Sequence, residues 1–239
     1  APSATVYLVC SRTPGHTPDL DSEHLLAVGN PEFDRSVFPG LSSLQQTEGQ
    51  VGEIAKLYAS ASPSVLTRNE ARKTRVMNEM PSSDVIHLAS HYIVYPGEPM
   101  NSTLLLSRPP DGGDSDGPSA NLQANEVYGL KLRRAPVVVL SACDSGVEDY
   151  YNGEGMIGMS RVFIAAGAPV VVASLWQVET AATGKLMVSF HQHRKFDRVP
   201  TAEALALAQR DMLIGASGED HRHPYYWAGF TAIGGATTF

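Results

Sequence analysis

The stretch VVVLSAC, residues 137–143, decides the fold, because an uninterrupted apolar run ends there on small polar residues and a cysteine. Apolar runs without strict alternation are typical of strands that are buried on both faces, as in parallel sheets. We expect further strands of this kind at 6–9, 25–28, 85–88 and 170–175, and an edge strand at 230–233.

Segments with helical spacing of apolar residues lie between these runs. They predict helices at 48–60, 70–80, 125–130, 156–166, 180–194 and 201–214. Asn69 is expected to cap the second helix, and Gly167 suits the position just past the fourth. The alternation of strands and helices predicts a single α/β domain, residues 1–239, with a mostly parallel central sheet flanked by helices.

The composition limits the classes of function. The chain has 239 residues, a net charge of −7, two cysteines, and no stripe of Lys or Arg. We therefore expect no direct nucleic-acid binding. Its apolar stretches are too short to span a bilayer, and the few cysteines suit a reducing compartment. These observations favour a cytoplasmic domain, which we expect to have been excised from a longer chain.

Two of the predicted strands end on reactive side chains. His91 closes the segment that begins at Val85, and Cys143 closes the segment that begins at Val137. The carboxyl ends of the strands are where open α/β sheets place their active crevice. If the two strands are neighbours, the imidazole lies beside the thiol and can take its proton, which makes the thiolate a nucleophile.

Less reactive interpretations compete with this dyad. A cysteine after an apolar strand is often a small buried hydrophobe, and Cys10 fits that description. His87 and His91 have the spacing of a metal pair, but no Glu follows as in H-E-x-x-H. We expect no metal or other cofactor, and interpret His87 as a core histidine that is satisfied by hydrogen bonds.

The segments around the dyad resemble a known family. VIHLASHY (85–92), LSACDSG (140–146), GEGMIGMSRVFIAAGAPVVVASLWQV (153–178) and HPYYWAGFTAIGG (223–235) are similar to CHAT domains, with LLAVGNPEF (25–33) as the opening strand. CHAT domains are caspase-like, separase-related cysteine peptidases that often follow tetratricopeptide repeats. The resemblance covers about residues 24–236, and it implies a three-layer caspase-like sandwich.

The resemblance also implies roles for particular residues. It identifies His91 as the catalytic histidine and Cys143 as the nucleophile, with the backbone N–H groups of Cys143 and Tyr92 stabilising the oxyanion. The family often has Gly where Tyr92 stands, so we expect a narrower cleft here. Glu179 and Asp144 are candidates for binding a basic P1 side chain, although Asp144 fits an ordinary Asx-turn equally well. No third catalytic residue is assigned, because a backbone carbonyl would orient the imidazole equally well.

The resulting hypothesis is a cysteine endopeptidase in signalling that cleaves a protein partner, with a basic residue as the candidate P1 preference. The resemblance implies regulation by an activating partner or by an upstream tetratricopeptide-repeat region. The alternative is a catalytically silent, caspase-like interaction module. A peptide probe that reacts with Cys143 distinguishes the two.

Overall fold

The computed structural model describes residues 3–12, 19–95, 97–108, 120–141, 157–216 and 221–236. Its centre is a six-stranded sheet in the order β2-β1-β3-β7-β8-β9. All neighbours pair in parallel except β9, which is antiparallel to β8 at the edge. The strands are β1 (Leu25–Pro31), β2 (Ser64–Arg68), β3 (Val85–Ala89), β7 (Val137–Leu140), β8 (Val170–Ser174) and β9 (Phe230–Gly234). This topology confirms the predicted mostly parallel sheet.

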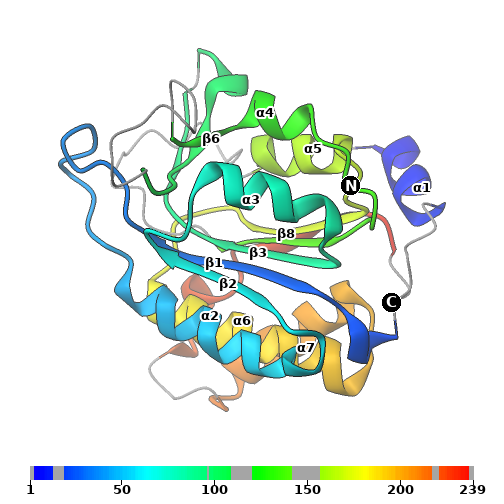
Figure 1. Cartoon of the computed structure of the whole chain (residues 1–239). Coiled ribbons are helices and arrows are strands. Elements are labelled where there is room, and N and C mark those ends of the chain that lie inside the picture. The colour runs from blue at the N-terminus through cyan, green and yellow to red at the C-terminus, as the bar shows by residue number, and fades with distance from the viewer. Residues whose placement is uncertain are drawn as a thin grey trace.

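Helices cover both faces of the sheet, giving three layers (Figure 1). One face packs against α2 (Gln45–Leu57), α6 (Thr180–Gln192) and α7 (Thr201–Leu213), and the other against α3 (Lys73–Glu79), α4 (Ala124–Tyr128) and α5 (Ile157–Ala165). Shorter helical turns are η1 (Leu20–Ser22), η2 (Ala59–Ala61), η3 (Met80–Ser82), η4 (Pro99–Asn101) and η8 (Pro224–Tyr226), and the π-helical η6 (His193–Asp197) continues α6.

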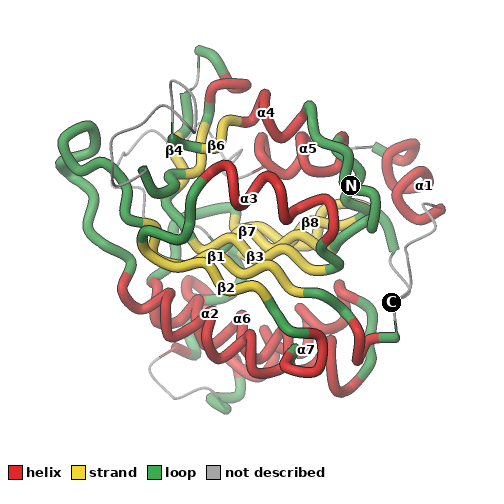
Figure 2. The backbone as a smooth tube through the Cα atoms, viewed as in Figure 1, coloured by secondary structure: helices red, strands yellow, loops and turns green. Residues whose placement is uncertain are grey.

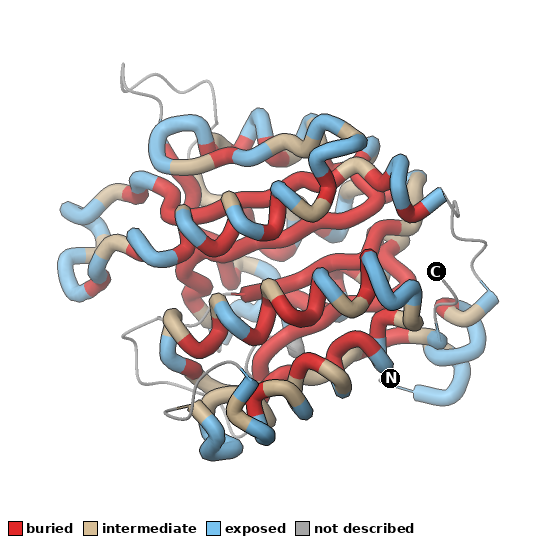
Figure 3. The backbone as a smooth tube through the Cα atoms, turned by 90° about the horizontal axis from the view of Figure 1, so that it is seen from below, coloured by how far each residue is buried: buried red, intermediate tan, exposed pale blue. Residues whose placement is uncertain are grey.

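The apolar runs become strands because each contributes to two cores. In β1, Leu26 and Val28 face the α3–α5 layer, whereas Leu25 and Ala27 face α2 and α6. Side chains alternate along a strand, so a run without polar interruption is what burial on both faces requires. The four inner strands β1, β3, β7 and β8 are buried along their whole length, and Figure 3 shows the helices buried along one stripe.

A second, three-stranded antiparallel sheet lies near the carboxyl end of β3 (Figure 2). It consists of β4 (Tyr92–Ile93), β5 (Thr103–Leu104) and β6 (Leu122–Gln123). The chain passes through this sheet and α4 between β3 and β7. The extra elements allow β3 and β7 to pair in parallel, because a parallel connection needs a long crossover.

The strand predicted at 6–9 is wrong. These residues belong to the helix α1 (Ala4–Arg12), in which Cys10 is buried and Tyr7, Leu8 and Val9 are exposed. A short apolar run has no periodicity that separates strand from helix. The prediction is wrong because an apolar run is not necessarily buried, and these side chains lie at the surface.

The predicted start of the helix at 70–80 is also wrong. Asn69 and Glu70 form a turn, and Arg72 is extended where it bridges to Ser107, so that α3 begins only at Lys73. The strand β2 was missed, because only Leu66 in it is buried and an edge strand carries little apolar signal. The other predicted helices are present, and Gly167 follows α5 with a φ of 115°, as its predicted position requires.

Within the described ranges, every helix falls short of the length and apolarity that a membrane crossing demands.

Candidate active site

His91 lies at the carboxyl edge of the sheet, two residues past the end of β3. Its side chain is buried, at 1% exposure, and its Nε2 atom lies 2.8 Å from the carbonyl oxygen of Ser42. A carbonyl only accepts hydrogen bonds, so Nε2 carries a proton, and in the neutral form of the ring the lone pair is on Nδ1. The contact with Ser42 therefore makes Nδ1 the nitrogen that can accept a proton.

The carbonyl of Ser42 is held by the junction of β1 and α2. Asn30 Oδ1 accepts a hydrogen bond from the backbone N–H of Leu44 at 2.9 Å, and the N–H of Asn30 donates to Thr47 Oγ1 at 2.8 Å. Gly29 allows this close approach, because a Cβ atom there would lie 2.8 Å from the carbonyl oxygen of Thr47. The start of α2 is thus fixed against the end of β1, and Ser42 lies just before it.

Ser42 could not be found from the sequence, because every residue carries a carbonyl. The prediction allowed for a backbone carbonyl as the group that orients His91, and the structure places one there.

Two further contacts fix the segment around His91. The ring of Phe33 packs edge-on against the imidazole, with ring centroids 5.2 Å apart. The backbone N–H of Leu105 donates to the carbonyl of His91 at 2.9 Å. The imidazole therefore has an apolar wall on one side, and the backbone of His91 is held by the small sheet.

β7 lies directly beside β3, as the dyad hypothesis requires. Leu88 pairs with Leu140, and the N–H of Ser141 donates to the carbonyl of Leu88 at 2.9 Å. The structure thus brings the segment leading to Cys143 next to the segment leading to His91. Cys143 and Asp144 lie outside the described residues, so their predicted roles stay predictions.

Tyr92 turns its side chain into the core and not over the sheet edge. It is 6% exposed, and burial raises the pKa of its hydroxyl. His91 and Leu105 form a hydrogen-bonded pair across the antiparallel strands, and Tyr92 faces Leu104 in the next pair. Because such pairs alternate, the N–H of Tyr92 points away from β5.

Glu179 is the residue before α6 and lies half exposed. Its carboxylate oxygen is 3.2 Å from His221 Nε2, and the other nitrogen of that ring lies 3.3 Å from Lys185 Nζ. Glu179 is thus part of a surface cluster with a neighbouring histidine and lysine.

His87 is a core histidine, as predicted. It is fully buried inside β3, and its nitrogens lie 3.1 Å from Gln50 Nε2 and 3.1 Å from His191 Nε2. Burial lowers the pKa of His87 to about 3, so the ring is neutral near pH 7. Cys10 is a buried free thiol whose pKa is raised by burial.

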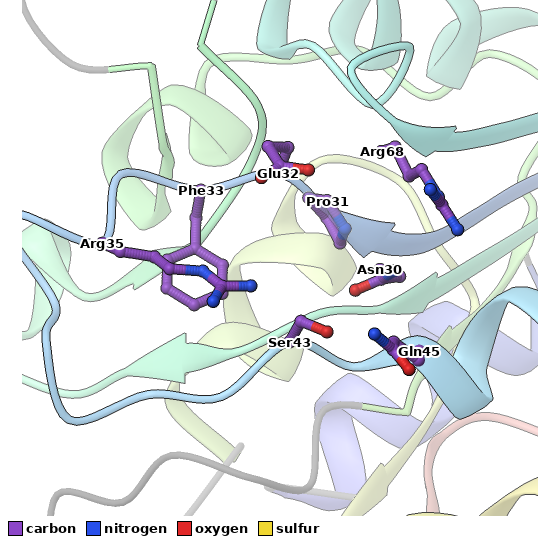
Figure 4. A pocket seen from close by; sticks show the side chains of 8 residues that line it. All are labelled: Asn30, Pro31, Glu32, Phe33, Arg35, Ser43, Gln45 and Arg68. Carbon is purple, nitrogen blue, oxygen red and sulfur yellow. The ribbon is translucent and has the colours of Figure 1, made fainter.

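A polar pocket of about 110 Å³ lies at the carboxyl end of β1 (Figure 4). Phe33 lines this pocket and also packs against the imidazole of His91. Glu32, Arg35 and Arg68 give it charges of both signs, and Arg68 is paired with Glu48 at 2.5 Å. The remaining lining residues are Asn30, Pro31, Ser43 and Gln45. Its walls suit a polar side chain and not an apolar one.

Similar sequences occur in tetratricopeptide-repeat proteins. Tetratricopeptide repeat protein 28 from human is 27% identical over 87% of this chain, and its mouse counterpart is 26% identical over the same share. This chain covers only 9% of the length of each relative.

Solved structures of similar fold are cysteine-protease structures and a separase complex. The Saccharomyces cerevisiae separase–securin complex matches with a TM-score of 0.60 at 18% identity, over 100% of this chain and 14% of the other. The Arg-specific cysteine proteinase gingipain R matches with a TM-score of 0.55 at 10% identity, over 96% of this chain and 51% of the other. These likenesses establish a caspase-like fold. The CHAT domain family matches residues 1–235, and the chain therefore belongs to that family.

Proposed function

We propose that the domain is a cysteine endopeptidase in which His91 is the general base and Cys143 the nucleophile. The observation that carries the proposal is the placement of His91. Its Nε2 proton is held by the carbonyl of Ser42, and the ring lies just past the end of β3, which pairs with β7. Cys143 follows the end of β7 by three residues, so a short segment leads from Ser141 to the thiol.

The reaction uses Nδ1 of His91 as the proton acceptor. Nδ1 takes the thiol proton, and the sulfur of Cys143 forms a bond to the scissile carbonyl carbon. The N–H groups of Tyr92 and Cys143 stabilise the oxyanion. The carbon–nitrogen bond then breaks as the imidazolium gives its proton to the leaving amine. A water molecule, deprotonated by His91, hydrolyses the thioester and releases the thiol.

Basic P1 specificity is the finer part of the proposal. Glu179 and Asp144 supply negative charge for an Arg or Lys side chain. Replacing Glu179 by Gln is expected to lower cleavage after Arg relative to cleavage after a neutral residue. Glu203→Gln on the exposed side of α7 is the matched control, and an equal Arg preference in both variants contradicts the role of Glu179.

The substrate is a protein partner in the cytoplasm, where a thiol stays reduced. Regulation by a tetratricopeptide-repeat region is supported by the name of the human relative and by the small share of it that this chain covers. The proposal predicts that cleavage by this domain changes when it is linked to such a region.

The deciding experiment is Cys143→Ala in a panel of peptides with basic, acidic and apolar P1 residues. We expect cleavage to be lost while the protein stays folded, as judged by circular dichroism. Cleavage that persists in this variant overturns the assignment of Cys143. A wild-type protein whose Cys143 resists every peptide probe indicates the silent interaction module instead.

A further inference from the structure

A row of polar side chains runs through the layer between the sheet and α2 and α6. Gln50 Nε2 donates to Ser141 Oγ at 3.2 Å and lies 3.1 Å from His87 Nε2. His87 Nδ1 lies 3.1 Å from His191 Nε2, and His191 Nδ1 lies 3.0 Å from the hydroxyl of Tyr58. We call these five residues the buried polar row.

The surroundings of the buried polar row are apolar. Val85 and Ala89 flank His87 along β3, and Val51 and Ile54 lie beside Gln50 on α2. All of the row's members are buried. Burying polar groups among apolar side chains lowers stability unless hydrogen bonds compensate, and an apolar filling of equal volume usually serves stability as well. Stability alone therefore does not account for the row.

The two histidines are neutral, so each ring donates one hydrogen bond and accepts one, and all bonds of the row run in the same direction. Burial lowers the pKa values of both rings, and the positive charge of Arg194 adds to the lowering at His191. If Gln50 donates to His87 Nε2, His87 donates from Nδ1 to His191, and His191 donates to Tyr58. Turning the Gln50 amide around reverses every link together. In either arrangement each ring donates one hydrogen bond and accepts another. These bonds fix the distances between the members of the row.

Gln50 contacts two of the three elements that build the candidate site and belongs to the third. It bonds to Ser141 just past β7, and to His87, four residues before His91. Gln50 itself lies on α2, whose preceding residues include Ser42, the partner of His91 Nε2. The dyad geometry depends on the relative placement of β3, β7 and the start of α2.

We infer that Gln50 is a positioning residue: through His87 and Ser141 it holds the ends of β3 and β7 against α2 at the spacing that the catalytic pair needs. His191 anchors the row from α6, and Tyr58 ends it at the far end of α2. This inference rests on the proposed function for its catalytic consequence, but the spacing of the strand ends is testable without it.

The test compares Gln50→Met with Gln46→Met. Both changes replace an amide by a thioether of similar size on α2, but Gln46 is exposed. The first readout is the rate at which iodoacetamide alkylates Cys143, measured as a function of pH by peptide mass. We expect Gln50→Met to slow alkylation near pH 6 by about ten- to a hundredfold and to move the pH midpoint toward the ordinary thiol value of about 8.5.

The second readout is amide hydrogen exchange. Ser141 N–H bonds to Leu88 across the strand ends, so we expect it to exchange faster in Gln50→Met, while Val85 at the other end of β3 is unchanged. Ser141→Ala, which removes only one end of the row, gives the same pattern at smaller amplitude. It also serves if Gln50→Met fails to fold.

The outcomes separate the two proposals. If the wild-type Cys143 reacts as an ordinary thiol, the endopeptidase proposal fails, and the exchange of Ser141 alone decides the role of Gln50. If Cys143 is activated, unchanged alkylation and unchanged Ser141 exchange in Gln50→Met overturn the positioning role. A purely structural role would lower the melting temperature and leave the pH profile of the folded protein as it is in Gln46→Met.

Discussion

His87 lies within β3 and His91 just beyond its end, and although both rings are buried, different kinds of partner hold them. His91 bonds at Nε2 to a carbonyl, which only accepts, so its tautomer is fixed with the lone pair on Nδ1. His87 lies between an amide and a second imidazole, each of which has donors and acceptors. The first environment selects one proton acceptor, whereas the second keeps a ring neutral and in place. Burial alone therefore does not tell a reactive histidine from a structural one.

The largest effect is expected from removing His91. We expect His91→Ala to lower kcat/KM for a cleaved peptide by about a thousandfold or more, since it removes the proposed general base. The melting temperature is expected to change little. His223→Ala, a histidine on the exposed C-terminal segment, is the control. Equal losses in the two variants would refute the special role of His91.

The next largest effect lies at the far end of the buried layer. Arg194 and Glu23 form a buried bidentate pair, with Nη1–Oε2 and Nη2–Oε1 distances of 2.7 and 2.5 Å. Arg194→Met leaves the Glu23 carboxylate buried without that partner, and we expect the free energy of unfolding to fall by about 3–5 kcal/mol. Urea unfolding measures this change.

The double variant Glu23→Leu with Arg194→Met checks the reason for that loss. It removes both charges, and we expect it to recover most of the lost free energy. If the double variant is as unstable as Arg194→Met, packing of the arginine stem and not the orphaned charge causes the loss.

Titration separates a neutral core histidine from a surface one. The pKa of His87 is lowered by burial to about 3, and in the unfolded chain it is about 6.5. The stability that the neutral ring contributes is present above about pH 6.5 and is lost as the pH falls toward about 3, at up to about 1.4 kcal/mol per pH unit. His191 acts in the same sense, because its pKa is also lowered by burial.

His193 has the opposite sign. Burial opposes the shift, but hydrogen bonds to Asp197 and Asp211 raise its pKa, so its contribution is present at low pH and is lost as the pH rises through the raised value. Urea unfolding at about pH 7 and pH 5 is therefore expected to show a smaller acid loss in His87→Leu with His191→Leu, and a larger one in His193→Gln. The same slope in both variants would contradict the assignment.

Sequence patterns predicted the sheet because a strand that is buried on both faces needs apolar residues at successive positions. VVVL at 137–140 became β7 with the predicted limits, whereas the apolar residues 6–9 became an exposed helix. The position of His91 was predictable, because the end of a strand is local in sequence. What orients it was not, since the Ser42 carbonyl has no side-chain signature.

The buried polar row was unpredictable for a related reason. Helical spacing places Gln50 on the buried face with Val51 and Ile54, but a polar residue there is ordinarily expected to reach solvent. Its partner His87, and His191 beyond it, are distant in sequence and meet only when α2 and α6 pack side by side on β3. The information lies in the packing of the layers, which no local pattern contains.

The smallest effect on stability is expected for an exposed ion pair near the buried one. Arg198 and Asp21 lie near Arg194 and Glu23 and pair at 3.2 Å, but their side chains are 57% and 64% exposed. Water already solvates both charges, so Arg198→Met is expected to change the free energy of unfolding by no more than about 0.5 kcal/mol. Both substitutions are Arg to Met, so their difference isolates the effect of burial. A loss in Arg198→Met as large as in Arg194→Met would mean that the stem of the arginine, and not the desolvated partner, determines the stability of this region.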